Sequence, residues 1–279
     1  MPNTLLIKVS TKLSSSFLLL VSIILMTSCD SQSLSNVNHF EEGVNLYHQG
    51  LFDEAIEKLD KAVEADPNSS APHEAKSEIY RMIGKLDLSL DSLNEAIKTR
   101  PVAPDNVRLY RVRGRTHDMI GNFDLAEKDF GSAISLSPKD ATLYGDRAWF
   151  YFTQEKYYQS AEDWETSVNL NPSDISTAFY SSLTYYKLED YKKVIDLNNA
   201  VIESDPGHGN AYNQTGEAYF QLGEYGKALA SFDKAIELYG DRGIYYKNRG
   251  NTHNKLGNKE LGKSDLKQAC ELNPGLCSE

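Results

Sequence analysis

Prolines at a fixed interval are the feature that most constrains how this chain can fold. Pro67 and Pro101 are 34 residues apart, and the same interval separates Pro138, Pro172 and Pro206. Glycine recurs in phase at one position (Gly43, Gly114, Gly216 and Gly250), and alanine at two others (Ala55, Ala126 and Ala228; Ala62, Ala96, Ala133, Ala235 and Ala269). A period of this length indicates stacked supersecondary units, each of which needs its neighbours to bury its apolar face.

The residue types at the repeated positions favour pairs of packed helices. Glycine and alanine allow two helices to approach closely, and proline ends the second helix of each pair. Large side chains at another repeated position, such as Phe130, Trp164, Phe232 and Leu266, fill the space between successive pairs. The sequence therefore predicts an all-α fold whose stability is a sum of unit and interface terms.

This pattern resembles the tetratricopeptide repeat (TPR) family, whose unit is a helix, a tight turn and an antiparallel helix. The match is closest in the first, third and sixth units (Gly43, Ala55, Leu59, Ala62 and Pro67; Gly114, Ala126, Phe130, Ala133 and Pro138; Gly216, Tyr219, Ala228, Phe232 and Ala235). It implies a right-handed α-solenoid of about seven units within residues 36–276, followed by a tail at 277–279. The units span residues 36–69, 70–103, 107–140, 141–174, 175–208, 209–242 and 243–276.

Two regions depart from the regular repeat. Units four and five carry serine, valine and asparagine at packing positions (Ser160 and Ser167; Val194, Asn198 and Val201), so altered helix packing is expected there. Extra residues around Val102 and Pro104 lengthen the link between units two and three, where a kink or a hinge is expected.

The first thirty residues carry a targeting pattern. Lys8 and Lys12 precede an apolar run over residues 17–26, which is followed by small residues and Cys29. This order is typical of a secretory signal. Because the run is shorter than the roughly 20 residues needed to cross a bilayer, a retained transmembrane anchor is the weaker alternative.

The segment from Leu25 to Cys29 resembles a bacterial lipoprotein signal, although Met26 stands where another aliphatic residue is usual. The resemblance implies a signal peptide at 1–28, lipidation of Cys29 and a lipid-anchored tether at 29–35. The protein would then lie in the bacterial cell envelope, on the periplasmic or outer face of a membrane. The alternative is a cysteine that follows an apolar stretch by chance.

Charges recur at positions 7 and 23 of the unit, which lie at matching height on the two antiparallel helices. Arginine and aspartate occupy them in three units (Arg113 with Asp129, Arg147 with Asp163, and Arg249 with Asp265). In the first unit the signs are exchanged together, with Glu42 and Lys58. Because the signs of the two charges are exchanged together, they predict an ion pair between the two helices. Such an ion pair would contribute about 0–1 kcal/mol if exposed.

No pattern of catalytic residues stands out. The six histidines are spread over separate units, so converging metal ligands are not expected. Phosphate-binding loops, nucleophile elbows and metalloprotease motifs do not occur in the sequence. A net charge of -11 and a pI of about 5.1 argue against a nucleic-acid partner. We therefore expect no enzyme activity, no metal and no cofactor.

The last two cysteines have two interpretations. Cys270 takes a repeat position that is aliphatic in the other units, so it can serve as a buried apolar side chain. Pro274 and Gly275 could instead turn the tail back, and an exported chain can form a disulfide between Cys270 and Cys277.

The family resemblance implies that the first helix of each unit lines a concave face through positions 2, 5, 9, 12 and 13. At these positions the chain carries a basic set (Arg81, Arg108, Arg111 and Arg115) and an apolar set (Trp149, Phe152, Phe179, Leu183 and Tyr186). We take them as candidate partner-binding residues for an acidic segment that contains aromatic residues. The alternative is that the apolar set completes the packing and that the arginines pair with acids such as Glu74, Glu78 and Asp118.

Three functions fit this sequence. The first is a membrane-anchored scaffold or adaptor that binds a protein or peptide. The second is a receptor for a glycan or small ligand, because aromatic residues in a groove can also stack on sugar rings. The third is a homo-oligomer that pairs through its last unit, although Lys259, Lys263 and Lys267 make the last helix polar enough to act as a cap.

Overall fold

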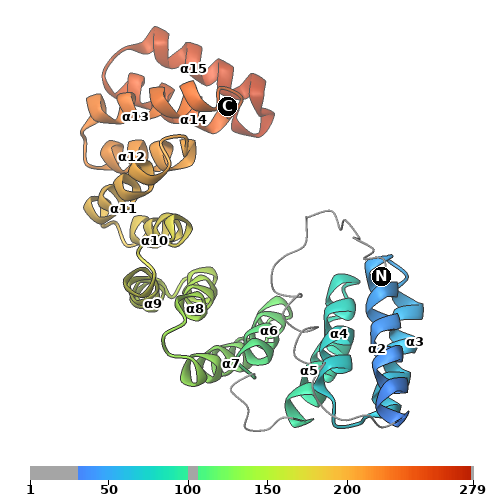
Figure 1. Cartoon of the computed structure of the whole chain (residues 1–279). Helices are drawn as coiled ribbons and strands as arrows, with labels where there is room; N and C mark the ends of the chain where they lie inside the picture. Colours follow the sequence, from blue (N-terminus) through green and yellow to red (C-terminus); the bar gives the residue numbers. More distant parts are fainter. Residues whose placement is uncertain (1–30, 100–105, 278–279) are drawn as a thin grey trace, which may run out of the picture. The chain divides into compact units, whose positions relative to one another are not determined.

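The computed structural model describes residues 31–99 and 106–277, and within these ranges all regular structure is helical (Figure 1). Fourteen α-helices and one short 3-10 helix follow one another there. The α-helices are α2 (Ser31–His48), α3 (Phe52–Ala65), α4 (Ser70–Met82), α5 (Leu86–Thr99), α6 (Asn106–Met119), α7 (Phe123–Leu136), α8 (Ala141–Thr153), α9 (Tyr157–Leu170), α10 (Ile175–Lys187), α11 (Tyr191–Ser204), α12 (Gly209–Gln221), α13 (Tyr225–Leu238), α14 (Gly243–Lys255) and α15 (Lys259–Leu272), and the 3-10 helix is η2 (Pro274–Leu276). The predicted all-α fold is confirmed.

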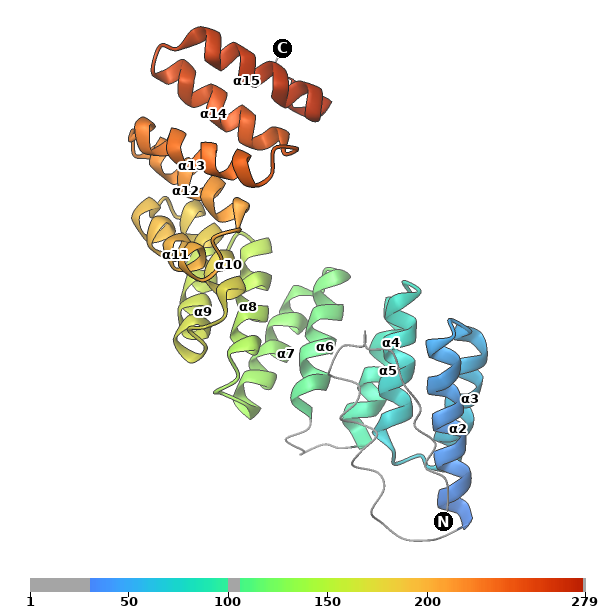
Figure 2. The same ribbon diagram turned by 45° about the horizontal axis from the view of Figure 1, so that its top comes forward.

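The helices pack in consecutive pairs, from α2 with α3 to α14 with α15. They form two compact parts that divide between Pro101 and Val102, within the lengthened link. From here on, unit 1 and unit 2 are the names of these two parts and not of single repeats. Unit 1 holds α2 to α5, and α3 packs there against α4. Unit 2 holds α6 to α15, and each second helix packs against the first helix of the next pair (Figure 2).

The N-terminal helix is longer than the sequence predicted. Helix α2 begins at Ser31, so residues 31–35, which we expected to form a tether, belong to a helix. The reason is that no glycine or proline interrupts the chain between Ser31 and Gly43, so each added residue costs little. The predicted signal peptide and Cys29 lie outside the described residues.

Close contact between a small and a large side chain holds each regular pair together. A Cβ atom added at Gly216 of α12 would lie 2.6 Å from Cε1 of Phe232 on α13. The same substitution at Gly43 would place a Cβ atom 2.8 Å from Cγ of Leu59. Because Leu59 and Phe232 are almost fully buried, they cannot easily move away, and these two pairs therefore require glycine at this position.

The predicted ion pairs between paired helices are confirmed. Arg113 donates to Asp129 through two nitrogens, each 2.7 Å from an oxygen, and Arg147 binds Asp163 at 2.7 and 2.8 Å. Arg249 binds Asp265 in the same way, and Lys58 pairs with Glu42. The aspartates are buried, which the sequence did not predict, so loss of one partner should cost more here than in an exposed pair.

The irregular units replace this packing with buried hydrogen bonds. Ser160 Oγ donates to the carbonyl of Ala148, and Ser167 Oγ donates to that of Ala141, both at 2.8 Å. Asn198 stands where other units place a leucine or an aromatic residue, and it is fully buried. Its Nδ2 atom donates to Oε1 of Gln214 at 3.2 Å, while Ser182 Oγ lies 2.6 Å from the same oxygen. A polar cluster therefore joins α10, α11 and α12.

The end of the described chain is closed by a disulfide between Cys270 of α15 and Cys277, whose Cα atoms are 4.7 Å apart. Between them, η2 turns the chain back towards α14: a Cβ atom added at Gly243 would lie 3.1 Å from Cδ1 of Leu276. The tail therefore packs on the last helix pair.

We expect Arg147→Met to lower the free energy of unfolding by about 3 kcal/mol, because it leaves the Asp163 carboxylate buried without its cation. Adding Asp163→Leu to this variant should recover most of the loss. Urea unfolding followed by circular dichroism measures both effects. The matched control is Lys61→Met, which breaks an exposed pair with Glu57 and should cost less than 1 kcal/mol. Equal losses in the two single variants would contradict the role of burial.

Candidate partner-binding face

Unit 2 presents a face built from its first helices α6, α8, α10, α12 and α14, which we call the first-helix face. Side chains link each of these helices to the next. Arg111 and Arg115 of α6 both pair with Asp146 of α8, and Trp149 of α8 meets the edge of Tyr180 of α10. The remaining links are hydrogen bonds (Tyr186 with Gln221, and Tyr245 with Asn210). These links leave the outer parts of several side chains accessible.

The face is basic at α6. Arg111 and Arg115 share the single carboxylate of Asp146, whose side chain is 10% exposed, while the Arg115 side chain is 53% exposed. Arg108 is exposed on the same helix, and Asp118 supplies one more carboxylate. Arg111 and Arg115 therefore share one carboxylate, and about half of the Arg115 side chain stays open to a further anion.

The expected acidic partners of the arginines were partly wrong. Arg81 pairs with Glu78 at 2.6 Å as the alternative interpretation stated, and both lie in unit 1. Arg111 and Arg115 instead pair with Asp146, which the sequence analysis did not consider. Asp146 stands at position 6 of its repeat, and Arg111 stands at position 5 of the repeat before it. Because the first helices of neighbouring repeats lie side by side, charges at these two positions could have been expected to meet.

Aromatic side chains gather between α8 and α10. Trp149 stacks on Phe152 with ring centroids 5.3 Å apart, and its ring is 5.5 Å from that of Tyr180. Tyr180 in turn stacks on the buried Trp164. Trp149 and Tyr180 are each 43% exposed. Tyr180 was not among the predicted residues, and it completes an exposed aromatic corner with Trp149.

The other predicted apolar residues, Phe152, Phe179, Leu183 and Tyr186, are half-buried. Phe179 packs on the core around Ala178 and Val201, and its ring contacts that of His208 at 4.8 Å. Tyr186 contacts Tyr191 of α11. Part of this set therefore completes the packing, as the alternative interpretation stated, and Trp149 is the most exposed of the five.

A half-buried carboxylate lies on α12. Glu217 Oε1 accepts a hydrogen bond from Nδ2 of Asn248 at 2.7 Å, and the same amide donates to Asn213 Oδ1 at 3.0 Å. Burial raises the pKa of Glu217, and hydrogen bonds from Asn248 and Asn213 offset this only in part. The sequence analysis did not single out Glu217, although it holds the repeat position of Arg115 and Trp149.

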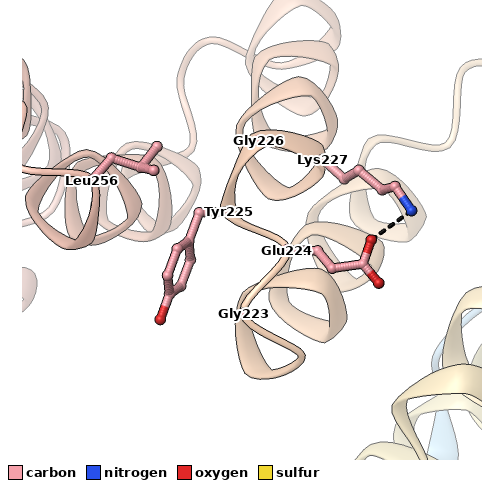
Figure 3. A pocket seen from close by; sticks show the side chains of 6 residues that line it. All are labelled: Gly223, Glu224, Tyr225, Gly226, Lys227 and Leu256. Carbon is pink, nitrogen blue, oxygen red and sulfur yellow. Dashed lines mark ion pairs between the residues drawn. The ribbon is translucent and has the colours of Figure 1, made fainter.

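A pocket lies where α12 turns into α13 (Figure 3). Gly223, Tyr225, Gly226 and Leu256 line it, together with Glu224 and Lys227, which pair with each other at 2.5 Å. Because its two charged groups already satisfy each other, the pocket has little with which to select a charged ligand, and we do not include it in the candidate site.

Two searches of the described residues bear on other functions. Histidine, cysteine, aspartate and glutamate side chains do not converge there in a group of three or more that could hold a metal ion. In the same residues, every helix is too short or too polar to cross a membrane.

The stacked helix pairs define an α-solenoid, and comparisons with known proteins agree. Models of the tetratricopeptide repeat match residues 38–69, 209–241 and 245–276. The chain is a tetratricopeptide repeat protein. The C-terminal part of a TPR repeat-containing protein from Cytophaga hutchinsonii has a similar fold, with a TM-score of 0.70 and 18% identity over 84% of this chain and 95% of that one.

Curated relatives are similar over part of the chain. Human tetratricopeptide repeat protein 13 is 26% identical over 176 residues, which cover 60% of this chain and 20% of that protein. Hsc70-interacting protein 1 of Drosophila melanogaster is 33% identical over 101 residues, which cover 36% of this chain and 26% of that protein. The matched region thus spans about a quarter or less of the length of each relative.

The raised pKa of Glu217 leads to a prediction about pH. The pKa of Glu217 is higher in the folded chain than in the unfolded chain, so between these two pKa values the folded chain binds more protons than the unfolded chain. The stability of the fold therefore falls as the pH rises through this window. Glu217→Gln should remove this fall, and the variant should be more stable than the wild type above the window. Urea unfolding from pH 4 to pH 8 tests it, with Glu203→Gln, an exposed change on α11, as the control. A stability difference from the wild type that does not vary with pH would contradict the prediction.

Proposed function

We propose that this chain is a non-catalytic scaffold or adaptor of the bacterial cell envelope that binds a protein or peptide segment on the first-helix face of unit 2. TPR proteins generally serve as protein-interaction scaffolds and are generally non-catalytic. The name of the Drosophila relative likewise describes a protein that interacts with another protein. The partner is an acidic segment with aromatic residues, and nucleic acid is not expected as a partner.

One observation carries this proposal. Arg115 and Trp149 occupy the same repeat position on neighbouring first helices, and the Arg115 side chain is 53% exposed and Trp149 is 43% exposed. An exposed tryptophan beside surplus arginines is the composition of a binding hot spot. A partner carboxylate would pair with Arg115, and a partner aromatic or aliphatic side chain would cover Trp149. Arg81 lies in unit 1 beside Glu78 and is not part of the proposed surface.

A second candidate function rests on the aromatic corner. Trp149 and Tyr180 expose neighbouring rings, which can stack on the apolar face of a sugar. This candidate is a receptor for a glycan or small ligand. Binding of soluble cell-wall fragments that is lost in Trp149→Ala would favour it over the scaffold.

We expect Trp149→Ala to weaken binding of the protein partner by about 30-fold or more, as loss of a hot-spot residue does. Arg115→Gln should lower the association rate and the salt dependence of binding. The partner is first identified by chemical crosslinking of the wild-type protein in intact cells, and binding is then measured with purified proteins. Tyr158→Ala and Arg242→Gln alter exposed side chains outside this part of the face and serve as matched controls.

If Trp149→Ala and Arg115→Gln fold as the wild type does and bind the partner unchanged, the assignment of the face is wrong. Far-ultraviolet circular dichroism and thermal unfolding check the fold of each variant.

The membrane part of the proposal rests on the sequence pattern around Cys29. Lipidation at Cys29 would hold the chain at the membrane surface, with only Asp30 between the lipid and the start of α2. Cys29→Ser should therefore move the protein from the membrane fraction to the soluble fraction of the cells. The double change Cys270→Ser and Cys277→Ser is the control, and it should leave the protein with the membrane. Equal recovery of wild type and Cys29→Ser in the membrane pellet would reject the anchor.

A further inference from the structure

Residues at position 9 of successive 34-residue repeats form one row along the first-helix face of unit 2. The row contains Arg115 on α6, Trp149 on α8, Leu183 on α10 and Glu217 on α12, each 34 residues after the one before. The links between neighbouring first helices hold these helices side by side in chain order. The row therefore runs from a cation through an aromatic and an aliphatic side chain to an anion.

The two charged ends of the row are not neutralised in the same way. At α6, Arg115 shares the carboxylate of Asp146 with Arg111, and its side chain is still 53% exposed. At α12, Glu217 accepts hydrogen bonds from amides, and no lysine or arginine of the described chain pairs with it.

A ligand that covered Glu217 with an apolar group would take this carboxylate out of water without compensation, which is costly. A ligand cation at the same place would form a charge-assisted hydrogen bond with it instead. The face thus rejects a uniformly acidic or uniformly apolar segment at α12 and accepts a basic side chain.

The spacing follows from helix packing. Neighbouring helix axes lie about 8–10 Å apart, so the three steps from α6 to α12 cover roughly 25–30 Å. An extended chain advances about 3.3 Å per residue, and about eight residues therefore separate the two ends of a bound segment.

We propose that the first-helix face of unit 2 selects a bipolar protein segment: an acidic residue at Arg115, apolar residues over Trp149 and Leu183, and a lysine or arginine at Glu217. This inference rests on the proposed function and adds the charge order and the length of the segment. Either chain direction satisfies it, since the order of side chains along the face is what matters.

The test selects phage-displayed random 16-residue peptides on the immobilised full chain. We expect enriched peptides to carry an acidic residue, then aromatic or aliphatic residues, then a basic residue about eight positions from the acid. Selection on Glu217→Gln should keep the acidic and apolar preference and lose the basic one. Selection on Glu203→Gln, the exposed change on α11, should match the wild type.

The peptide that binds most tightly is then used in a double-mutant cycle, in which fluorescence anisotropy measures its affinity for each variant. Glu217→Gln should weaken binding about tenfold when the peptide keeps its basic residue, and hardly at all when that residue is replaced by glutamine. Thermal unfolding checks that the variant is folded.

The outcomes separate the two proposals. Enrichment of acidic and apolar residues without a basic one, or a cycle without coupling at Glu217, overturns the bipolar segment and leaves the proposed function in place. Absence of any enriched peptide, or enrichment that is unchanged in Trp149→Ala, overturns both.

Discussion

The close approach of the two helices in each pair is the constraint on which the rest of this structure depends. In four pairs a glycine on the first helix meets a leucine or phenylalanine on the second, and no larger residue fits at Gly43 or Gly216 without moving a buried side chain. One residue earlier on the first helix, arginine reaches across to a buried aspartate in three pairs. Packing thus fixes the distance between the helices, and the bidentate ion pair fixes their register.

This arrangement determines which surfaces can be used for binding. Within each of the two compact units, the second helix of a pair packs on its own first helix and on the first helix of the pair that follows it there. The outer side of the first helices is not required for stacking, so its residues can vary in type. Arg115 and Trp149 stand at that side on neighbouring helices, and about half of each side chain is exposed. Binding residues and packing residues are in this way separated within a single helix.

In the middle of unit 2, the residues that pack the core are not fully separated from those that can bind a partner. There Asn198 replaces the large apolar residue, and a cluster with Ser182 and Gln214 takes its place. Buried amides tolerate few arrangements, because an unmade hydrogen bond in the core is costly. Phe179 and Tyr180 pack close to this region and also reach the first-helix face. Stability and binding share residues in these pairs, so a change to Phe179 affects both.

Charged side chains on the first-helix face can bind a partner only where contacts within the fold have not already neutralised them. Arg113 and Arg147 are held by buried aspartates and cannot select a partner. Arg111 and Arg115 share one carboxylate, and Glu217 has only amide donors. A strongly acidic chain can in this way present a half-exposed arginine at α6 and a carboxylate that is hydrogen-bonded by an amide at α12.

The sequence by itself determined the helical repeat and the pairs Arg113–Asp129, Arg147–Asp163 and Arg249–Asp265. These features depend on contacts within one unit, and a fixed period of 34 residues repeats such contacts at fixed offsets. The start of α2 at Ser31 was not determined, because polar residues without glycine or proline permit either a helix or a tether.

Only the tertiary structure decided which side chains meet between units. Asp146 was found to hold Arg111 and Arg115, Tyr180 to complete the corner at Trp149, and Asn248 to bind Glu217. The sequence gives the phase of a residue on its own helix, but contacts between neighbouring first helices depend on the stacking angle of the pairs. That angle is set jointly by every packed side chain at the interface, so no single repeat position reveals it.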